Sequence, residues 1–316
     1  MVRSAALIFC RKIIINKPDL LSLNGPLLIA SNHPNSFLDA VILDILFEKP
    51  VWSLARGDAF INRRVTKLLH AFKLLPVYRT TEGVENLSGN YETFNECIKI
   101  FRKNGMVQIF SEGQCYNEWH LRKLKKGTAR LANQSWEQGI ELKVLPVGIN
   151  YSSFKRFGKN VFINFGDLIT KISIDQQASE GLRYQQFNSL LEGELKELVY
   201  EIRKDDMRKQ EELLLIKQSM FKRIILFIPA MIGCVGHAAL YLPVNLLVRR
   251  KYENSGHFDS IVTTILVFSY PFYLLLLVFI VYLLTHSLFS LALLVLMPFC
   301  AWAYVEIKSQ LDRKVI

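Results

Sequence analysis

A histidine and an aspartate stand where an apolar run gives way to an amphipathic pattern, and residues 29–39 read IASNHPNSFLD. Junctions between a strand and a helix in α/β sheets are where sites tend to be built. A neutral imidazole can take a proton from an attacking hydroxyl, and a carboxylate on its other ring nitrogen fixes the tautomer and stabilises the imidazolium. His33 and Asp39 are therefore candidates for a general base and its orienting partner. A capped helix with a buried histidine would give the same pattern, so the pair needs support from other motifs.

The segments around this pair alternate between two patterns. Short apolar runs of strand length occur at 26–31, 51–55, 74–78, 106–110, 143–149 and 161–165. Helical patterns lie between them at 38–47, 84–103 and 128–138. This alternation predicts an α/β fold with a mostly parallel central sheet flanked by helices. A densely charged helical pattern follows at 184–218, typical of a solvated helix face and also suited to contact with anionic headgroups.

Further motifs follow the histidine in order. They are LPVYR at 75–79, IFSEG at 109–113, KKGTARLA at 125–132 and VLPV at 144–147. Together with the first stretch they resemble the glycerolipid acyltransferase family, which includes glycerol-3-phosphate and 1-acylglycerol-3-phosphate acyltransferases. The resemblance runs from about residue 24 to residue 170, and these motifs in this order are together far more specific than any one of them.

Two positions depart from the common family pattern. Five residues separate His33 from Asp39, where the family usually has four. Each added helical residue turns a side chain by about 100°, so the longer gap changes where the carboxylate points. A subset of the family, similar to eukaryotic-type glycerol-3-phosphate acyltransferases, shares the His-x5-Asp spacing, which favours the first acylation step slightly. Ser111 replaces the usual proline of the third motif, while Glu112 and Gly113 are retained.

The resemblance implies a role for each matching residue. His33 would be the general base and Asp39 its partner. Arg79 would bind the substrate phosphate, since a guanidinium fork suits phosphate oxygens. Glu112 and Gly113 would shape the glycerophosphate pocket, with the glycine letting backbone N–H groups approach an anion. Because a carboxylate beside a phosphate is unfavourable, Glu112 is better suited to hold a hydroxyl or to orient Arg79.

The implied reaction is O-acyl transfer in phospholipid synthesis. The donor would be acyl-CoA or an acyl carrier protein thioester, and the acceptor glycerol-3-phosphate or 1-acylglycerol-3-phosphate. No cofactor beyond the co-substrate is implied. Another lysolipid or an amino-acid lipid is an alternative acceptor. A different class of function, a catalytically inactive membrane scaffold or lipid-binding protein on the same fold, also stays open.

The charge balance points to a polyanionic surface. The 39 lysines and arginines exceed the 28 acids, giving a formal net charge of +11. Membrane lipid and nucleic acid would both suit this charge, but no zinc finger, basic helix array or stacking motif supports nucleic acid. A basic cluster at 122–126 is either an exposed loop or a phosphate contact. The remaining histidines and the five scattered cysteines show no metal-ligand spacing, so we expect no metal.

The composition changes sharply after residue 220. We predict an acyltransferase domain at 1–220, with an N-terminal helix that lies on the membrane or packs on the domain. A membrane-anchoring helical region at 221–316 would follow it. Three apolar segments, 224–248, 261–284 and 288–307, are each about long enough to span a bilayer. The first contains Pro229, Gly233, Gly236 and Pro243, which can break a helix.

Basic residues lie before the first apolar segment at 222–223, after it at 249–251, and after the last segment at 308, 313 and 314. Such flanking residues favour the cytoplasmic face of a membrane. An even number of crossings keeps all of them inside. We therefore expect the first segment to dip in and return while the other two cross, with three plain spans as the alternative. The chain is predicted to be an integral membrane protein with its catalytic domain on the cytoplasmic side.

Overall fold

The computed structural model describes residues 10–78, 89–253 and 255–312. The chain divides into two compact units. The first, called here the sheet unit, contains residues 15–150 and 162–203. The second, called the helical unit, contains residues 1–14, 151–161 and 204–316. The division passes within three strands, so the units are not simply consecutive along the chain.

In the described part of the chain, seven strands form one sheet in the order β1-β7-β6-β2-β5-β3-β4. The strands are β1 (Cys10–Ile15), β2 (Leu27–Ser31), β3 (Val51–Arg56), β4 (Leu74–Val77), β5 (Met106–Phe110), β6 (Lys143–Tyr151) and β7 (Lys159–Phe165). Strand β2 pairs in parallel with β5 and β6, and β3 pairs in parallel with β4 and β5. All five residues of β2 are buried, as expected for a central parallel strand covered on both faces. The predicted mostly parallel α/β sheet is confirmed.

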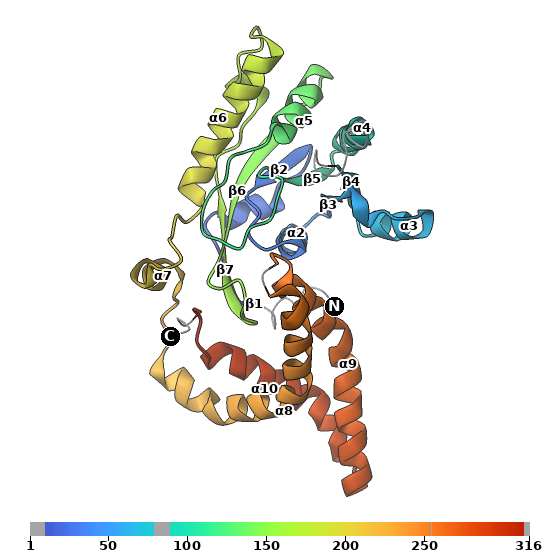
Figure 1. Ribbon diagram of the computed structural model, residues 1–316, viewed down its shortest axis with the longest axis vertical. Coiled ribbons are helices and arrows are strands. Elements are labelled where there is room, and N and C mark those ends of the chain that lie inside the picture. Colours follow the sequence, from blue (N-terminus) through green and yellow to red (C-terminus); the bar gives the residue numbers. More distant parts are fainter. Residues whose placement is uncertain (1–9, 79–88, 254, 313–316) are drawn as a thin grey trace. The chain divides into compact units, whose positions relative to one another are not determined.

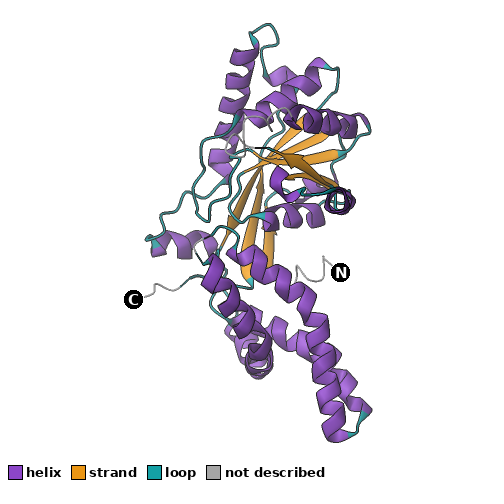
Figure 2. Cartoon of the chain, turned by 45° about the vertical axis from the view of Figure 1, so that its right-hand side comes forward, coloured by secondary structure: helices purple, strands orange, loops and turns teal. Residues whose placement is uncertain are grey.

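Helices pack around these strands (Figures 1 and 2). In the sheet unit they are α2 (Phe37–Leu46), α3 (Arg63–Ala71), α4 (Gly89–Arg102), α5 (Lys126–Glu137) and α6 (Glu180–Leu198), with short 3-10 helices at Pro18–Ser22, Gly57–Ala59 and Lys171–Ser173. One continuous core joins α4, α5 and α6 to the strands and includes the buried aromatic residues Phe94, Phe101, Trp136 and Phe187. The Trp136 indole donates to the Leu142 carbonyl at 2.8 Å, so its one polar atom is satisfied inside the core.

The N-terminal helix predicted from the sequence is wrong for residues 10–15, which form strand β1. The segment reads CRKIII, and β-branched residues in succession favour a strand because their side chains restrict the helical rotamers. Residues 1–9 lie outside the described part.

The charged helical pattern at 184–218 is two helices, because the chain leaves the helical conformation after α6 and re-enters it at α7 (Met207–Leu214). The Asn150 side chain explains the break. It donates to the Leu198 carbonyl at 3.0 Å and accepts from the Tyr200 N–H at 2.8 Å. These bonds replace the helical bonds that the backbone gives up there.

The helical unit contains α8 (Met220–Tyr252), α9 (Phe258–Thr285) and α10 (Leu293–Ile307), the last preceded by a 3-10 helix at Leu288–Ala292. Three of the described helical segments, 220–252, 258–285 and 288–307, are long and apolar enough to cross a membrane. Their side chains bury little of their surface within the chain, as expected of helices that face lipid.

The helix break predicted within 224–248 is wrong, because α8 continues through Pro229 and Pro243. The glycines there serve close packing. A Cβ at Gly233 would overlap the Cys300 carbonyl, and a Cβ at Gly236 would overlap Met297, so both let α10 approach α8. Neighbouring helices also supply hydrogen bonds to such a helix, as the Tyr273 hydroxyl does to the Gly236 carbonyl.

Both the start of α9 and the chain after α10 are tied to residues 151–161. Lys159 and Asp259 form a buried ion pair, and the Arg156 Nε donates to Asp312 at 3.1 Å. The first turn of α9 and residues 308–312 therefore belong to the same end of the helical unit.

Candidate active site

The sheet brings His33 and Glu112 together because they follow the carboxyl ends of adjacent parallel strands. Ser31, the last residue of β2, is in register with Phe110, the last residue of β5. The pairing extends one residue further, since the Ser111 N–H donates to the Ser31 carbonyl at 2.8 Å. A proline at 111 could not make this bond. The Ser111 hydroxyl also accepts from Thr128 at 3.0 Å, which links this turn to α5.

Asn32 extends the sheet on the other side of β2. Its side-chain amide donates to the Ile149 carbonyl at 3.0 Å, and its side-chain oxygen accepts from the Ile149 N–H at 2.8 Å. The side chain thus reproduces a strand pairing with β6 directly before the histidine. Sequence analysis missed Asn32, although a buried polar residue ending an apolar strand was a signal for it.

The predicted pair is formed. His33 Nδ1 lies 2.8 Å from Asp39 Oδ2, and the Asn35 N–H donates to the same oxygen at 2.8 Å. The Asp39 side chain is fully buried, while 12% of the His33 side chain is exposed. An ionised carboxylate only accepts hydrogen bonds, so Nδ1 carries the proton and Nε2 presents its lone pair. Among the described residues, none hydrogen-bonds Nε2.

Phe110 fixes the plane of the imidazole. The two rings are stacked, with centroids 3.9 Å apart and an angle of 10° between planes. Phe110 therefore covers one face of the imidazole, and the ring is held on that face as well as by Asp39.

The longer His-x5-Asp gap is accommodated in the loop before the helix. Ser36 takes φ 54° and ψ −142°, and α2 begins at the next residue, with Asp39 in its first turn. The Ser36 N–H donates to the Cys115 sulfur at 2.9 Å, which holds this turn in place. The extra residue is used in the turn, so the carboxylate still reaches the histidine.

Glu112 acts on the backbone of the site. One carboxylate oxygen accepts the His33 N–H at 3.0 Å, and the other accepts the Arg122 N–H at 2.9 Å. Burial raises the pKa of this carboxyl, while the two backbone hydrogen bonds and the nearby His33 oppose the rise. The carboxylate thus joins the loop carrying His33 to the loop carrying Arg122.

Gly113 serves a turn. Its φ is +71°, a conformation that favours glycine, and its N–H donates to the Phe110 carbonyl at 3.0 Å. That N–H is therefore already engaged within the protein.

Arg79, the residue expected to bind phosphate, lies outside the described residues. Arg122 is a second guanidinium tied to the site through its backbone bond to Glu112. Its guanidinium carbon lies 3.6 Å from the Tyr116 ring centroid, and its Nε donates to Glu118. The hydrogen bond that Arg122 donates to Glu118 raises the pKa of Arg122. With 41% of its side chain exposed, Arg122 can present its remaining N–H groups to a phosphate.

No group of three or more His, Cys, Asp or Glu side chains in the described ranges is arranged to hold a metal ion. The chemistry that these residues can perform is proton transfer at Nε2 of His33, supported by the buried carboxylate of Asp39.

Comparison with known proteins gives three results. Residues 12–150 match the family described as Acyltransferase. No match was found among proteins with curated functions. The crystal structure of the 1-acyl-sn-glycerophosphate acyltransferase from Thermotoga maritima is similar at 16% identity, with 69% of this chain and 78% of that chain covered and a TM-score of 0.45. That structural similarity is too low to support an argument, whereas the family match spans all the motifs around His33. Residues 12–150 of this chain therefore resemble the acyltransferase family, over a stretch that contains every motif around His33.

Proposed function

We propose that the chain is an O-acyltransferase that moves a fatty acyl group from a thioester to a hydroxyl of glycerol-3-phosphate or 1-acylglycerol-3-phosphate. The observation that carries this proposal is the His33–Asp39 pair, which leaves Nε2 as a proton acceptor that no described residue hydrogen-bonds. The donor is acyl-CoA or an acyl carrier protein, and both present the same thioester to the site.

The acceptor hydroxyl attacks the thioester carbonyl directly. As the new C–O bond forms, Nε2 of His33 takes the hydroxyl proton, and Asp39 stabilises the resulting imidazolium. The tetrahedral intermediate then collapses, the C–S bond breaks, and the imidazolium returns the proton to the leaving thiolate. The products are an ester and a free thiol, so no acyl-enzyme intermediate is required.

A phosphate on the acceptor matches the cations of this region. Arg122 is joined through Glu112 to the backbone of His33, so a phosphate held by its guanidinium stays in a fixed relation to the base. Arg79 is the second proposed phosphate ligand, because it occupies the position of the phosphate-binding arginine in the family motif that LPVYR resembles. Glu112 positions both loops and Gly113 shapes their turn, and in the proposal neither needs to contact the phosphate.

The membrane helices suit this reaction because the acyl chain and the product are both lipids. Basic residues flank the apolar segments, which supports a catalytic domain on the cytoplasmic side. A polar acceptor would then enter from the cytoplasm, while the acyl chains remain near the lipid.

The test is an assay of the purified full chain with labelled glycerol-3-phosphate or 1-acylglycerol-3-phosphate, each with acyl-CoA or acyl carrier protein. We expect transfer to one acceptor with at least one donor, and loss of that transfer in His33→Ala. Absence of transfer in all four combinations, with a folded wild-type protein, would contradict the proposal and favour a lipid-binding scaffold.

A further inference from the structure

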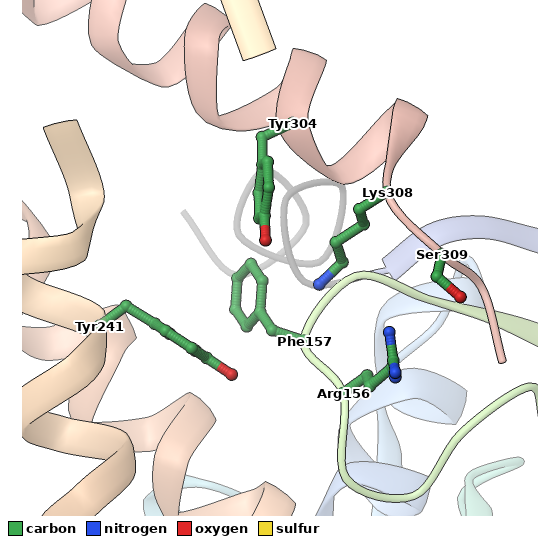
Figure 3. Close-up of a pocket in the computed structure, with 6 residues that line it drawn as sticks. All are labelled: Arg156, Phe157, Tyr241, Tyr304, Lys308 and Ser309. Carbon is green, nitrogen blue, oxygen red and sulfur yellow. The ribbon is translucent and has the colours of Figure 1, made fainter. Parts of the chain in front are cut away.

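The helical unit contains a cavity of about 390 Å³ between α8, the end of α10 and the loop before β7. We call it the aromatic pocket. Its volume falls within the range of about 300–1,000 Å³ that is usual for small-molecule sites. It is lined by Arg156, Phe157, Tyr241, Tyr304, Lys308 and Ser309 (Figure 3).

The aromatic pocket is cationic. Figure 3 shows the amine of Lys308 directed toward Phe157, with the Arg156 guanidinium on the other side of that amine in this view. Lys308 Nζ lies 5.8 Å from the Phe157 ring centroid and 5.5 Å from that of Tyr304, and among the described residues it has no carboxylate partner. Among the described residues, the Arg156 guanidinium donates one hydrogen bond, from its Nε to Asp312 at 3.1 Å. Its terminal nitrogens remain available as donors.

The surrounding structure holds both cations in place. The Ser153 hydroxyl donates to Asp312 at 2.8 Å and accepts from the Arg156 N–H at 2.9 Å, which fixes the turn that carries Arg156. Arg11 donates to the carbonyls of Glu306 and Lys308 and so secures the end of α10. The two cations are thus pre-positioned, which lowers the entropic cost of binding an anion.

The pocket lies where apolar helices meet polar chain. Lys308 directly follows a segment apolar enough to cross a membrane, and Tyr241 belongs to another such segment. Large apolar side chains on the same helices are exposed, including Leu242, Leu246, Leu296 and Phe299. Tyrosines with an apolar ring and a polar end favour the headgroup level of a bilayer, as do cations at helix ends.

We propose that the aromatic pocket binds the phosphate of an anionic membrane phospholipid, with Arg156 and Lys308 as its ligands. A guanidinium and an ammonium can both donate charge-assisted hydrogen bonds to phosphate oxygens. The Tyr241 and Tyr304 rings border the glycerol part, and the acyl chains lie along the exposed apolar faces of α8 and α10. The proposal is independent of the proposed acyl transfer.

The charges around Lys308 disfavour its protonated form, which a bound anion would stabilise. Burial, together with the nearby Arg156, Lys159 and Arg11, lowers the pKa of Lys308 to about 7. Asp259 opposes them. Among the described residues that line the pocket, the other titratable groups are the Arg156 guanidinium and the hydroxyls of Tyr241 and Tyr304. A bound phosphate restores the protonated form of Lys308, so phosphate binding and protonation of Lys308 strengthen each other.

The test measures binding of radiolabelled phosphatidylglycerol to the full chain in dodecyl maltoside micelles. We expect Arg156→Gln and Lys308→Met to weaken binding by at least about tenfold each, because each removes charge-assisted hydrogen bonds. Lys308→Met should fold, since it removes a desolvated cation that other cations repel. Thermal melting without lipid checks this.

Lys251→Met is the matched control. Lys251 lies 5.5 Å from the Tyr252 ring centroid, as Lys308 does from Tyr304, but it is exposed and outside the pocket. We expect it, and His33→Ala, to bind phosphatidylglycerol as the wild type does. Unlabelled phosphatidylglycerol should displace the label, whereas diacylglycerol and glycerol-3-phosphate should not. Wild-type binding by both pocket variants would overturn the proposal. Displacement by diacylglycerol would also overturn it, because the phosphate would then not be needed. Displacement by glycerol-3-phosphate at the same concentration would overturn it as well, because the ligand would then be a soluble phosphate.

A pH series tests the Lys308 contact separately. Phosphatidylglycerol has no second phosphate ionisation, unlike a monoester whose second pKa is about 6, so its charge stays constant from pH 6 to pH 9. Wild-type binding should weaken as the pH rises across this range, because the empty pocket loses the Lys308 proton. Lys308→Arg, which stays charged, should bind equally at both ends. Equal wild-type affinity at pH 6 and pH 9 would overturn the role of Lys308.

Discussion

Replacing Asp39 with Asn isolates the charge of the buried carboxylate from its shape. Asn fills the same space, and its oxygen can still accept from the Asn35 N–H and from His33 Nδ1, which lie 2.8 Å from Oδ2. The tautomer of His33 can therefore be kept. The negative charge that stabilises the imidazolium is lost.

The structure sets the size of this effect. Full charges at the distance between Nδ1 and Oδ2, with an effective dielectric constant of about 20, attract by about 6 kcal/mol. Only part of the positive charge has developed in the transition state. If about half has developed, the loss is about 3 kcal/mol, which corresponds to roughly a hundredfold lower kcat.

The assay compares initial rates at saturating acceptor and donor for wild type and Asp39→Asn, with thermal melting as the check on folding. We expect kcat to fall about a hundredfold while the KM of the acceptor changes little, because Asp39 acts through His33 and touches no substrate. Asp44→Asn is the matched control, since Asp44 lies on the same helix and, among the described residues, accepts the Val51 N–H at 3.0 Å and has no contact with His33. A kcat within fivefold of wild type for Asp39→Asn would refute the assigned role of the carboxylate.

Four further outcomes follow from the described contacts. Ser36→Gly should keep activity and raise the unfolding free energy by up to about 1 kcal/mol, because glycine adopts positive φ without strain; a lower melting temperature would contradict this. Glu112→Gln keeps only one acceptor oxygen for the two N–H groups of His33 and Arg122. The acyl-transfer rate should therefore fall, and urea unfolding should show a loss of about 1–3 kcal/mol in the free energy of unfolding. Asp259→Ala should destabilise the protein by about 3–5 kcal/mol, since it leaves Lys159 buried without its ionic partner, and the double variant with Lys159→Met should recover most of this in thermal melting. Reporters fused at residue 255 and after residue 312 should lie on the same side of the membrane, because Asp259 and Asp312 both bind residues 151–161; opposite sides would contradict this arrangement.

The strand and helix pattern of the sheet unit could be predicted because its signals are local. The buried strand at 27–31 lies in a short apolar run, and the helix after it follows a helical pattern in the sequence. The order of motifs then indicated that His33 and Asp39 act together. Both residues lie at one strand–helix junction, between the end of β2 and the first turn of α2, where sites in α/β sheets tend to form.

The parts that the sequence did not reveal depend on contacts between distant residues. The positive φ of Ser36 is held by Cys115, and Asn32 is held by Ile149 more than a hundred residues away. The role of Glu112 in joining two loops also depends on the folded chain, since its partners are backbone N–H groups that any residue carries. Motifs identify which residues matter more readily than they identify what those residues touch.

The C-terminal region shows the same limit. Its apolar segments predicted long helices, and these are present. The prolines and glycines of α8 suggested a break, but Gly233 and Gly236 are instead required where α10 packs closely. A glycine needed for close packing and a glycine that ends a helix look alike until the neighbouring helix is known.

The most direct test of the proton acceptor is rescue of His33→Ala by free imidazole. The substitution leaves a space beside Asp39 and the Phe110 ring, the two groups that held the original imidazole. We expect acyl transfer to fall by at least about 10²-fold, as is typical when a general base is lost, and to recover as imidazole is added. Recovery should follow the neutral form of imidazole as the pH is varied. Transfer by His33→Ala at the wild-type rate without imidazole would contradict the assignment of His33 as the general base.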